Sequence, residues 1–74
     1  MALANPRKIT VNGTEYHWKV STRRELHLAV IEPGTARKLV VFFAEKRAVP
    51  PAVVRAFIEE VEALGWTGPV RWNR

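Results

Sequence analysis

Apolar and polar residues alternate with a period of two through the first quarter of the chain. Ile9 and Val11 in one segment, and Tyr16, Trp18 and Val20 in the next, would share one face of a sheet. The intervening Asn12-Gly13 is typical of a two-residue type I′ turn, because both of its central residues need a positive φ. The pattern predicts a hairpin of strands at about 8–12 and 14–20, with Val11 opposite Thr14 and Ile9 opposite Tyr16.

Two more strands are predicted, at about 25–31 and 38–44. To place Leu28 beside the apolar face of the hairpin, the preceding loop must have an odd number of residues, three or five. A three-residue loop would put His17 opposite His27. The Pro33-Gly34 turn then pairs Val30 with Leu39 and Leu28 with Val41, and it lets Glu32 face Arg37 across its base.

This register leaves a second set of apolar residues on the outer face of the sheet: Ala29, Ile31, Val40 and Phe42. A strand that is apolar on both faces is usually covered. The sequence leaves three covers open: the C-terminal segment with Trp72, a second copy of the chain, or a partner protein.

From Pro50 onward the period changes to about 3.6, which predicts a helix at about 51–64. Its apolar stripe comprises Val53, Val54, Phe57, Ile58, Val61 and Leu64, and Glu59, Glu60 and Glu62 are expected on the solvated side. Gly65 suits a left-handed cap, and Trp66 can fold back onto the helix end. In the tail, 65–74, Val70 and Trp72 suit a short edge strand.

The predicted fold is therefore α+β, an antiparallel β-meander of three to four strands packed on one face by a single C-terminal helix. One domain spanning 1–74 is expected, because 74 residues suffice for one core only. The outline is similar to a plant DNA-binding domain and to the N-terminal domain of some phage-type integrases, which read DNA with the sheet. None of their residue motifs occurs here.

A closer resemblance rests on Val11, Gly13, Tyr16, Trp18 and Val20, followed by Pro50 or Pro51, Val54, Ile58 and Gly65-Trp66. This order resembles short uncharacterised bacterial proteins with a Val-x-Gly-x-x-Tyr-x-Trp-x-Val hairpin and a helix ending in Gly-Trp. The resemblance implies the fold and a bacterial origin, and it implies no activity. Val49 replaces the usual Thr before the proline, so no side-chain oxygen is available there to cap the helix.

The net charge of +5 is unevenly distributed, with a basic first half and an acidic helix segment. Several basic residues are expected on or around the outer face, as candidate phosphate contacts: Lys8, Arg23, Arg24, Arg37 and Lys38. The centre of the candidate interaction face comprises Phe42, Val40, His27, His17 and Lys19. Aromatic rings among cations are typical of surfaces on which bases stack.

The chain offers little for catalysis. It has no Cys and no Asp, and its two histidines are expected at exposed positions of a flat sheet, where a metal site with Glu15 or Glu25 is disfavoured. We expect no enzyme activity, no metal and no cofactor. The longest apolar run, 39–44, is far shorter than the roughly 20 residues of a membrane span. We therefore expect a cytoplasmic protein.

Two functions follow from the outer face. The first is a non-catalytic protein-interaction or self-associating module centred on Phe42, Val40 and His27. The alternative is a nucleic-acid-binding domain that uses the basic residues of the same face. The apolar residues favour the first, and the charge favours the second.

Overall fold

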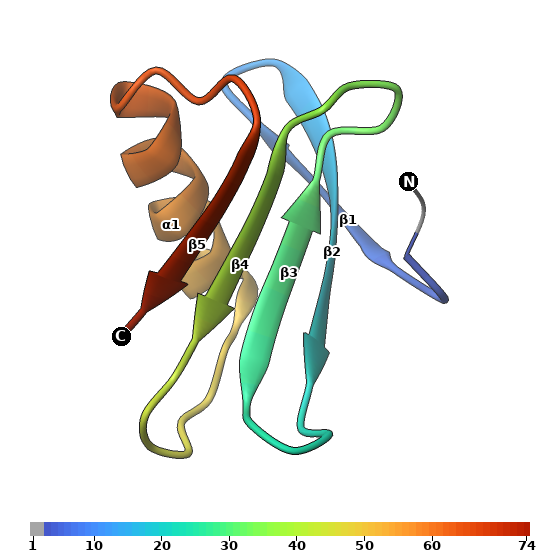
Figure 1. The fold of residues 1–74 in the computed structure, drawn as a ribbon. Helices are drawn as coiled ribbons and strands as arrows, with labels where there is room; N and C mark the ends of the chain where they lie inside the picture. Colours follow the sequence, from blue (N-terminus) through green and yellow to red (C-terminus); the bar gives the residue numbers. More distant parts are fainter. Residues whose placement is uncertain (1–2) are drawn as a thin grey trace.

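The computed structural model describes residues 3–74, which form one sheet and one helix (Figure 1). The sheet has five strands in the order of the chain. Their bounds are β1 Arg7–Val11, β2 Thr14–Ser21, β3 His27–Ile31, β4 Lys38–Phe42 and β5 Pro69–Asn73, with helix α1 at Pro51–Ala63 between the last two. The predicted α+β class and its single C-terminal helix are confirmed.

The β1–β2 hairpin turns through Asn12 and Gly13, which have φ values of 50° and 80°. Both values are positive, as a type I′ turn requires. Ile9 pairs with Tyr16 and Val11 with Thr14, so the predicted register is confirmed.

The loop from β2 to β3 has five residues, 22–26, since Ser21 pairs with His27. It is the longer of the two odd lengths that the sequence allows. Val20 therefore lies opposite Leu28, while His17 faces Ile31 and not His27. Strand β3 starts two residues later than predicted, because Glu25 and Leu26 belong to this loop.

Strands β3 and β4 pair as predicted, with Val30 opposite Leu39 and Leu28 opposite Val41. Strand β4 ends at Phe42 and not at residue 44. The expected edge strand is present: β5 pairs with β4 in parallel, because α1 carries the chain back to the other end of the sheet. Just past the end of β5, the Arg74 amide donates to the carbonyl of Phe42, the last residue of β4, at 2.7 Å.

Helix α1 starts without a side-chain cap after Pro50 and ends at Ala63, two residues before a left-handed Gly65, whose φ is 80°. The amide of Gly65 donates to the Glu62 carbonyl at 3.1 Å. The prediction that Leu64 joins the apolar stripe is wrong. Leu64 follows the last helical residue and is 71% exposed, and Trp66 is buried beside the helix end instead.

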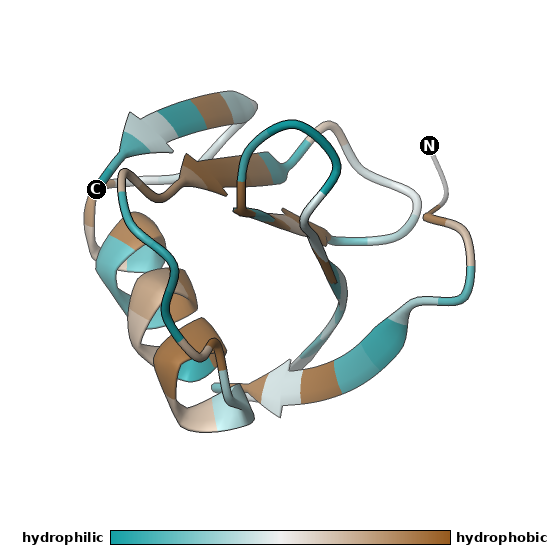
Figure 2. Cartoon of the chain, turned by 90° about the horizontal axis from the view of Figure 1, so that it is seen from below, coloured by the Kyte–Doolittle hydropathy of each residue, from teal (hydrophilic) through white to brown (hydrophobic). Residues whose placement is uncertain are grey.

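The sheet curls so that its concave side holds the core and α1 closes the open side between β1 and β5 (Figure 2). The helix contributes Val54, Phe57, Ile58 and Val61 to this core. The strands contribute the alternating residues that the pattern predicts, among them Tyr16, Trp18, Leu28, Val30, Leu39 and Val41. One face of the sheet is thereby buried, and the other is convex and faces outward.

Candidate functional site

The outer face of the sheet consists of the strand residues whose side chains point away from α1. The pairings arrange its central part in three rows across the strands. These rows are Lys8–His17–Ile31–Lys38–Pro69, then Lys19–Ala29–Val40–Arg71, then Ser21–His27–Phe42–Asn73. Glu15 lies beyond the first row, opposite Thr10.

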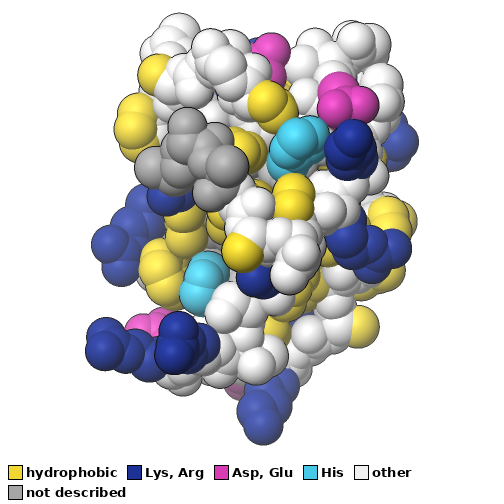
Figure 3. Space-filling model, turned by 90° about the vertical axis from the view of Figure 1, so that its right-hand side faces the viewer, with side chains coloured by type: hydrophobic (Ala, Val, Ile, Leu, Met, Phe, Trp, Pro, Cys, Tyr) yellow, Lys and Arg dark blue, Asp and Glu magenta, His cyan; other side chains and the backbone are white. Residues whose placement is uncertain are grey.

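Cations occupy the flanks of this face, and neutral residues occupy its middle strand. Lys19 and Arg71 end the second row, three strand spacings or about 14 Å apart. In the first row Lys8 lies at one end, and Lys38 lies three strands away, next to the terminal Pro69. Four cationic side chains thus share the outer face with one carboxylate, that of Glu15. Figure 3 shows Lys and Arg side chains, in dark blue, spread around one side of the molecule.

None of these four cations pairs with a carboxylate within residues 3–74. Lys8, Lys19 and Arg71 are exposed, and Lys38 is half-buried. The carboxylates gather elsewhere, with three of the seven on α1, on the opposite side of the sheet. The outer face therefore presents positive charge that is not neutralised locally.

Arg23 and Arg24 lie in the β2–β3 loop, exposed at the rim of the outer face. The amide of Glu25 donates to the carbonyl of Arg23 at 2.9 Å, which closes a three-residue turn centred on Arg24. Arg24 has a φ of 69°, a left-handed conformation that residues with a side chain rarely adopt. The loop holds this cation in a strained backbone.

Phe42 is half-buried by its own neighbours on the outer face. The Arg71 guanidinium lies 4.5 Å from the centre of its ring, and the His27 ring is 5.4 Å away on the other strand. The tail supplies Arg71 here and not Trp72, which points to the core and packs near Phe57. Of the three covers that the sequence leaves open, the C-terminal segment thus does not place Trp72 over Phe42.

A shallow hollow of about 290 Å³ lies beside Phe42, between β4 and β5. Its lining is apolar in the middle and cationic at both ends, and comprises Lys38, Val40, Phe42, Pro69, Val70 and Arg71. Ala29 adjoins it across β3, whereas Ile31 is buried, being only 3% exposed. The predicted outer apolar row thus contracts to Ala29, Val40 and Phe42.

The two histidines occupy different rows and do not meet. His17 Nε2 lies 3.3 Å from a Glu15 carboxylate oxygen, and His27 Nδ1 lies 3.1 Å from the Glu25 carbonyl oxygen. Across residues 3–74, no three His or Glu side chains come together in a way that would hold a metal ion. The histidines instead contribute flat, polar rings to a surface that also holds Lys, Arg and apolar side chains.

Arg37 was expected on or around the outer face, and the structure places it on the opposite side of the sheet. It has the parity of Leu39 and points to the concave side, where it pairs with Glu32 at 2.8 Å. That ion pair confirms the predicted contact across the turn. The guanidinium also lies 4.5 Å from the centre of the Trp66 ring.

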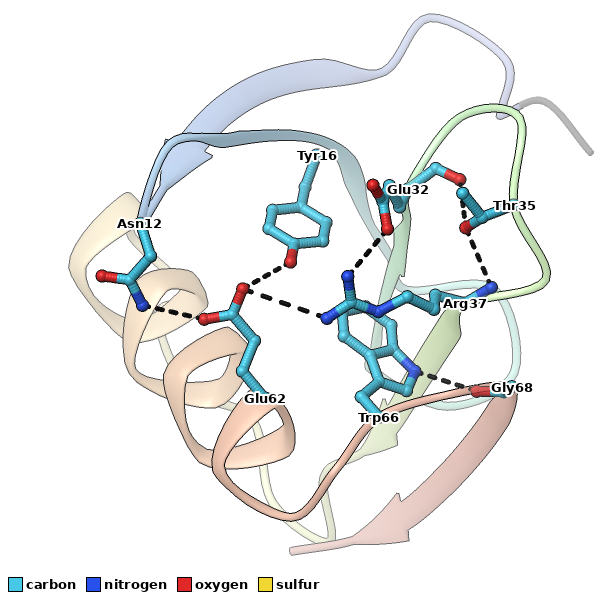
Figure 4. A network of polar contacts seen from close by, with 8 residues as sticks. All are labelled: Asn12, Tyr16, Glu32, Thr35, Arg37, Glu62, Trp66 and Gly68. Atoms are coloured by element: carbon cyan, nitrogen blue, oxygen red, sulfur yellow. Dashed lines mark hydrogen bonds and ion pairs between the residues drawn. The ribbon is translucent and has the colours of Figure 1, made fainter.

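Arg37 belongs to a group that we call the Glu62 cluster, which comprises Asn12, Tyr16, Glu32, Arg37, Glu62 and Trp66 (Figure 4). The Glu62 carboxylate accepts hydrogen bonds from Tyr16 Oη at 2.5 Å and from Asn12 Nδ2 at 2.9 Å, and Arg37 lies 4.0 Å away. The expectation that Glu62 faces solvent with Glu59 is wrong. A helical count places it at the edge of the stripe, where the hairpin turn reaches it.

Burial raises the pKa of the Tyr16 phenol to about 12, and the hydrogen bond to Glu62 adds to the effect. Tyr16 has no exposed surface and stacks on Trp66 with ring centres 5.5 Å apart. The cluster ties the end of α1 to β2 and to the β3–β4 turn. It lies on the concave side of the sheet, away from the outer face.

The fold and this surface define a small α+β domain with a convex, basic sheet face. No protein-family model, curated protein or solved structure matches the chain. Within residues 3–74, the helix is too short and too polar to cross a membrane.

Proposed function

We propose that this protein is a non-catalytic nucleic-acid-binding domain that contacts phosphates with the outer face of its sheet. The observation that carries the proposal is the set of four cations on that face, Lys8, Lys19, Lys38 and Arg71, which no carboxylate neutralises in the described residues. Arg23 and Arg24 extend it at the rim. Neutralising phosphates with Lys and Arg releases counterions, which drives such binding.

The composition of the face favours a nucleic acid over a membrane surface. A membrane-bound face needs exposed large apolar side chains to enter the lipid. The only exposed large apolar residue in the described chain is Leu64, at the end of α1. The aromatic rings that lie among the cations of the outer face, those of Phe42, His27 and His17, instead suit contacts with bases and sugars.

The test is salt-dependent binding of labelled mixed-sequence DNA and RNA, measured by fluorescence anisotropy. Replacing Lys19 and Lys38 by Ala should weaken binding and lower the slope of log Kd against log salt by about 0.7–0.9 per lysine. The matched control replaces Lys46 and Arg55, two exposed cations outside the outer face. Equal losses in both double variants would contradict a site on the sheet.

Association with a protein partner or a second copy is the competing proposal, and the hollow beside Phe42 supports it. Apart from the exposed Pro69, its apolar residues are half-buried, whereas a stable interface buries roughly 800 Å² on each partner, with an apolar centre. The basic charge would also repel a second copy placed face to face. Sedimentation at rising concentration separates the two: a dimer that Phe42→Ala dissociates supports association, and a monomer throughout opposes self-association.

A further inference from the structure

The middle of the outer face has a chemistry that phosphate binding alone does not explain. A surface that reads only a phosphate backbone needs cations, yet here the cations stand at the flanks. Between them lie Ala29, Val40 and the ring of Phe42, with the hollow of about 290 Å³ opening beside β5. That hollow is apolar along its floor and has Lys38 at one end and Arg71 at the other.

Flat groups meet at one end of this hollow. The Arg71 guanidinium lies over the Phe42 ring at 4.5 Å from its centre, and the tilted His27 ring adjoins it at 5.4 Å. Nucleic-acid bases stack on aromatic rings and on Arg guanidinium planes. In a duplex the faces of the bases are already stacked on one another, so only an unpaired base can occupy such a place.

We infer that the outer face binds single-stranded nucleic acid and seats one unpaired base in the hollow, against Phe42 and Arg71. This inference rests on the proposed function and adds the class of ligand. Lys38, in the lining of the hollow, and Lys19, two strands away in the row of Val40, take the phosphates that flank the seated base.

The experiment compares four labelled ligands at one salt concentration: a short single-stranded DNA, the matching RNA, the DNA duplex, and a single strand of the same length whose central nucleotides are abasic. We expect the single strands to bind at least about tenfold more tightly than the duplex. Phe42→Ala should weaken single-strand binding by about 5- to 150-fold, the range typical of one stacked base. It should leave the abasic strand unaffected, because that strand offers phosphates and no base.

Phe42→Leu provides a second variant, since it keeps an apolar side chain over Val40 and removes only the aromatic ring. The affinity of Phe42→Leu for single strands should fall by as much as that of Phe42→Ala, while its thermal stability stays that of the unmodified protein. If the duplex binds as tightly as the single strands and neither Phe42 variant changes binding, the inference is overturned while the proposed function stands. If none of the four ligands binds, both are overturned.

Discussion

Glu62 joins three parts of the molecule through one carboxylate. Its carboxylate accepts hydrogen bonds from the Tyr16 hydroxyl of β2 and from the Asn12 amide of the hairpin turn, and it lies near Arg37, just before β4. Hydrogen bonds to a charged group contribute more than neutral ones, and a buried donor that loses its acceptor is costly. This carboxylate therefore stabilises the attachment of the helix end to the sheet.

Replacing Glu62 by Ala should lower the free energy of unfolding by roughly 1–3 kcal/mol, because the buried Tyr16 hydroxyl loses its acceptor. Urea unfolding followed by tryptophan fluorescence measures this change. The control is Glu59→Ala, an exposed glutamate on the same helix, which should change stability by less than about 0.5 kcal/mol. Equal effects of the two variants would show that the Glu62 cluster adds no stability.

The raised pKa of Tyr16 predicts a loss of stability at high pH. The folded pKa of about 12 exceeds the ordinary value of 10.0, so the folded state holds the phenolic proton through a range in which the unfolded chain releases it. The contribution of the protonated Tyr16 phenol to the free energy of unfolding is complete below pH 10 and is lost as the pH rises to 12. We expect the stability advantage over Tyr16→Phe to shrink by roughly 2–3 kcal/mol across that window. A pH-independent difference would contradict the assignment.

Arg24 combines a strained backbone with an exposed charge. Glycine adopts its φ of 69° without a steric penalty, so Arg24→Gly should raise the free energy of unfolding by about 1 kcal/mol while it weakens nucleic-acid binding. Arg23→Gly removes the same charge from a residue outside the left-handed region, and should weaken binding with no gain in stability. If both variants lose stability, the strain at Arg24 is not significant.

Among the elements, helix α1 is terminated by the left-handed backbone of Gly65. Gly65 has a φ of 80°, and a Cβ there would meet no atom within 4 Å, so only the backbone conformation opposes a side chain. Gly65→Ala should therefore cost about 1 kcal/mol in urea unfolding. Gly68, equally open and without a positive φ, is the control, and Gly68→Ala should be neutral or slightly stabilising.

The elements were largely predictable from periodicity, because alternation and the 3.6-residue repeat report burial directly. The Asn12-Gly13 turn and the pairing of β3 with β4 followed from turn chemistry and parity. Parity alone left two lengths for the β2–β3 loop, since three and five residues present the same faces. The choice depends on loop packing, which no local pattern encodes.

The parts of the site that escaped prediction depend on contacts between distant residues. Glu62 interacts with Asn12 and Tyr16, about 50 positions earlier, so its helical position alone suggested solvent. Arg37 is two residues before the buried Leu39, so alternation along the strand already places its side chain on the buried face. The place of Arg71 over Phe42 required the parallel pairing of β5, a long-range feature.

For the molecule as a whole, curvature and charge act together. The sheet curls around α1, so one face is buried and the other becomes a convex surface with Lys and Arg at its flanks. Three of the seven carboxylates lie on the helix at the opposite side. Such a distribution orients the molecule toward a polyanion before contact is made, and the effect weakens as salt screens it.

The most direct test of this account is an amide NMR titration of the labelled protein with single-stranded and duplex DNA and RNA, at low and physiological salt. Binding through the outer face should give salt-sensitive shifts at Lys19, His27, Val40, Phe42 and Arg71, and none on the exposed side of α1. Shifts confined to the helix, or spectra that no nucleic acid changes while the lines broaden with protein concentration, would contradict it.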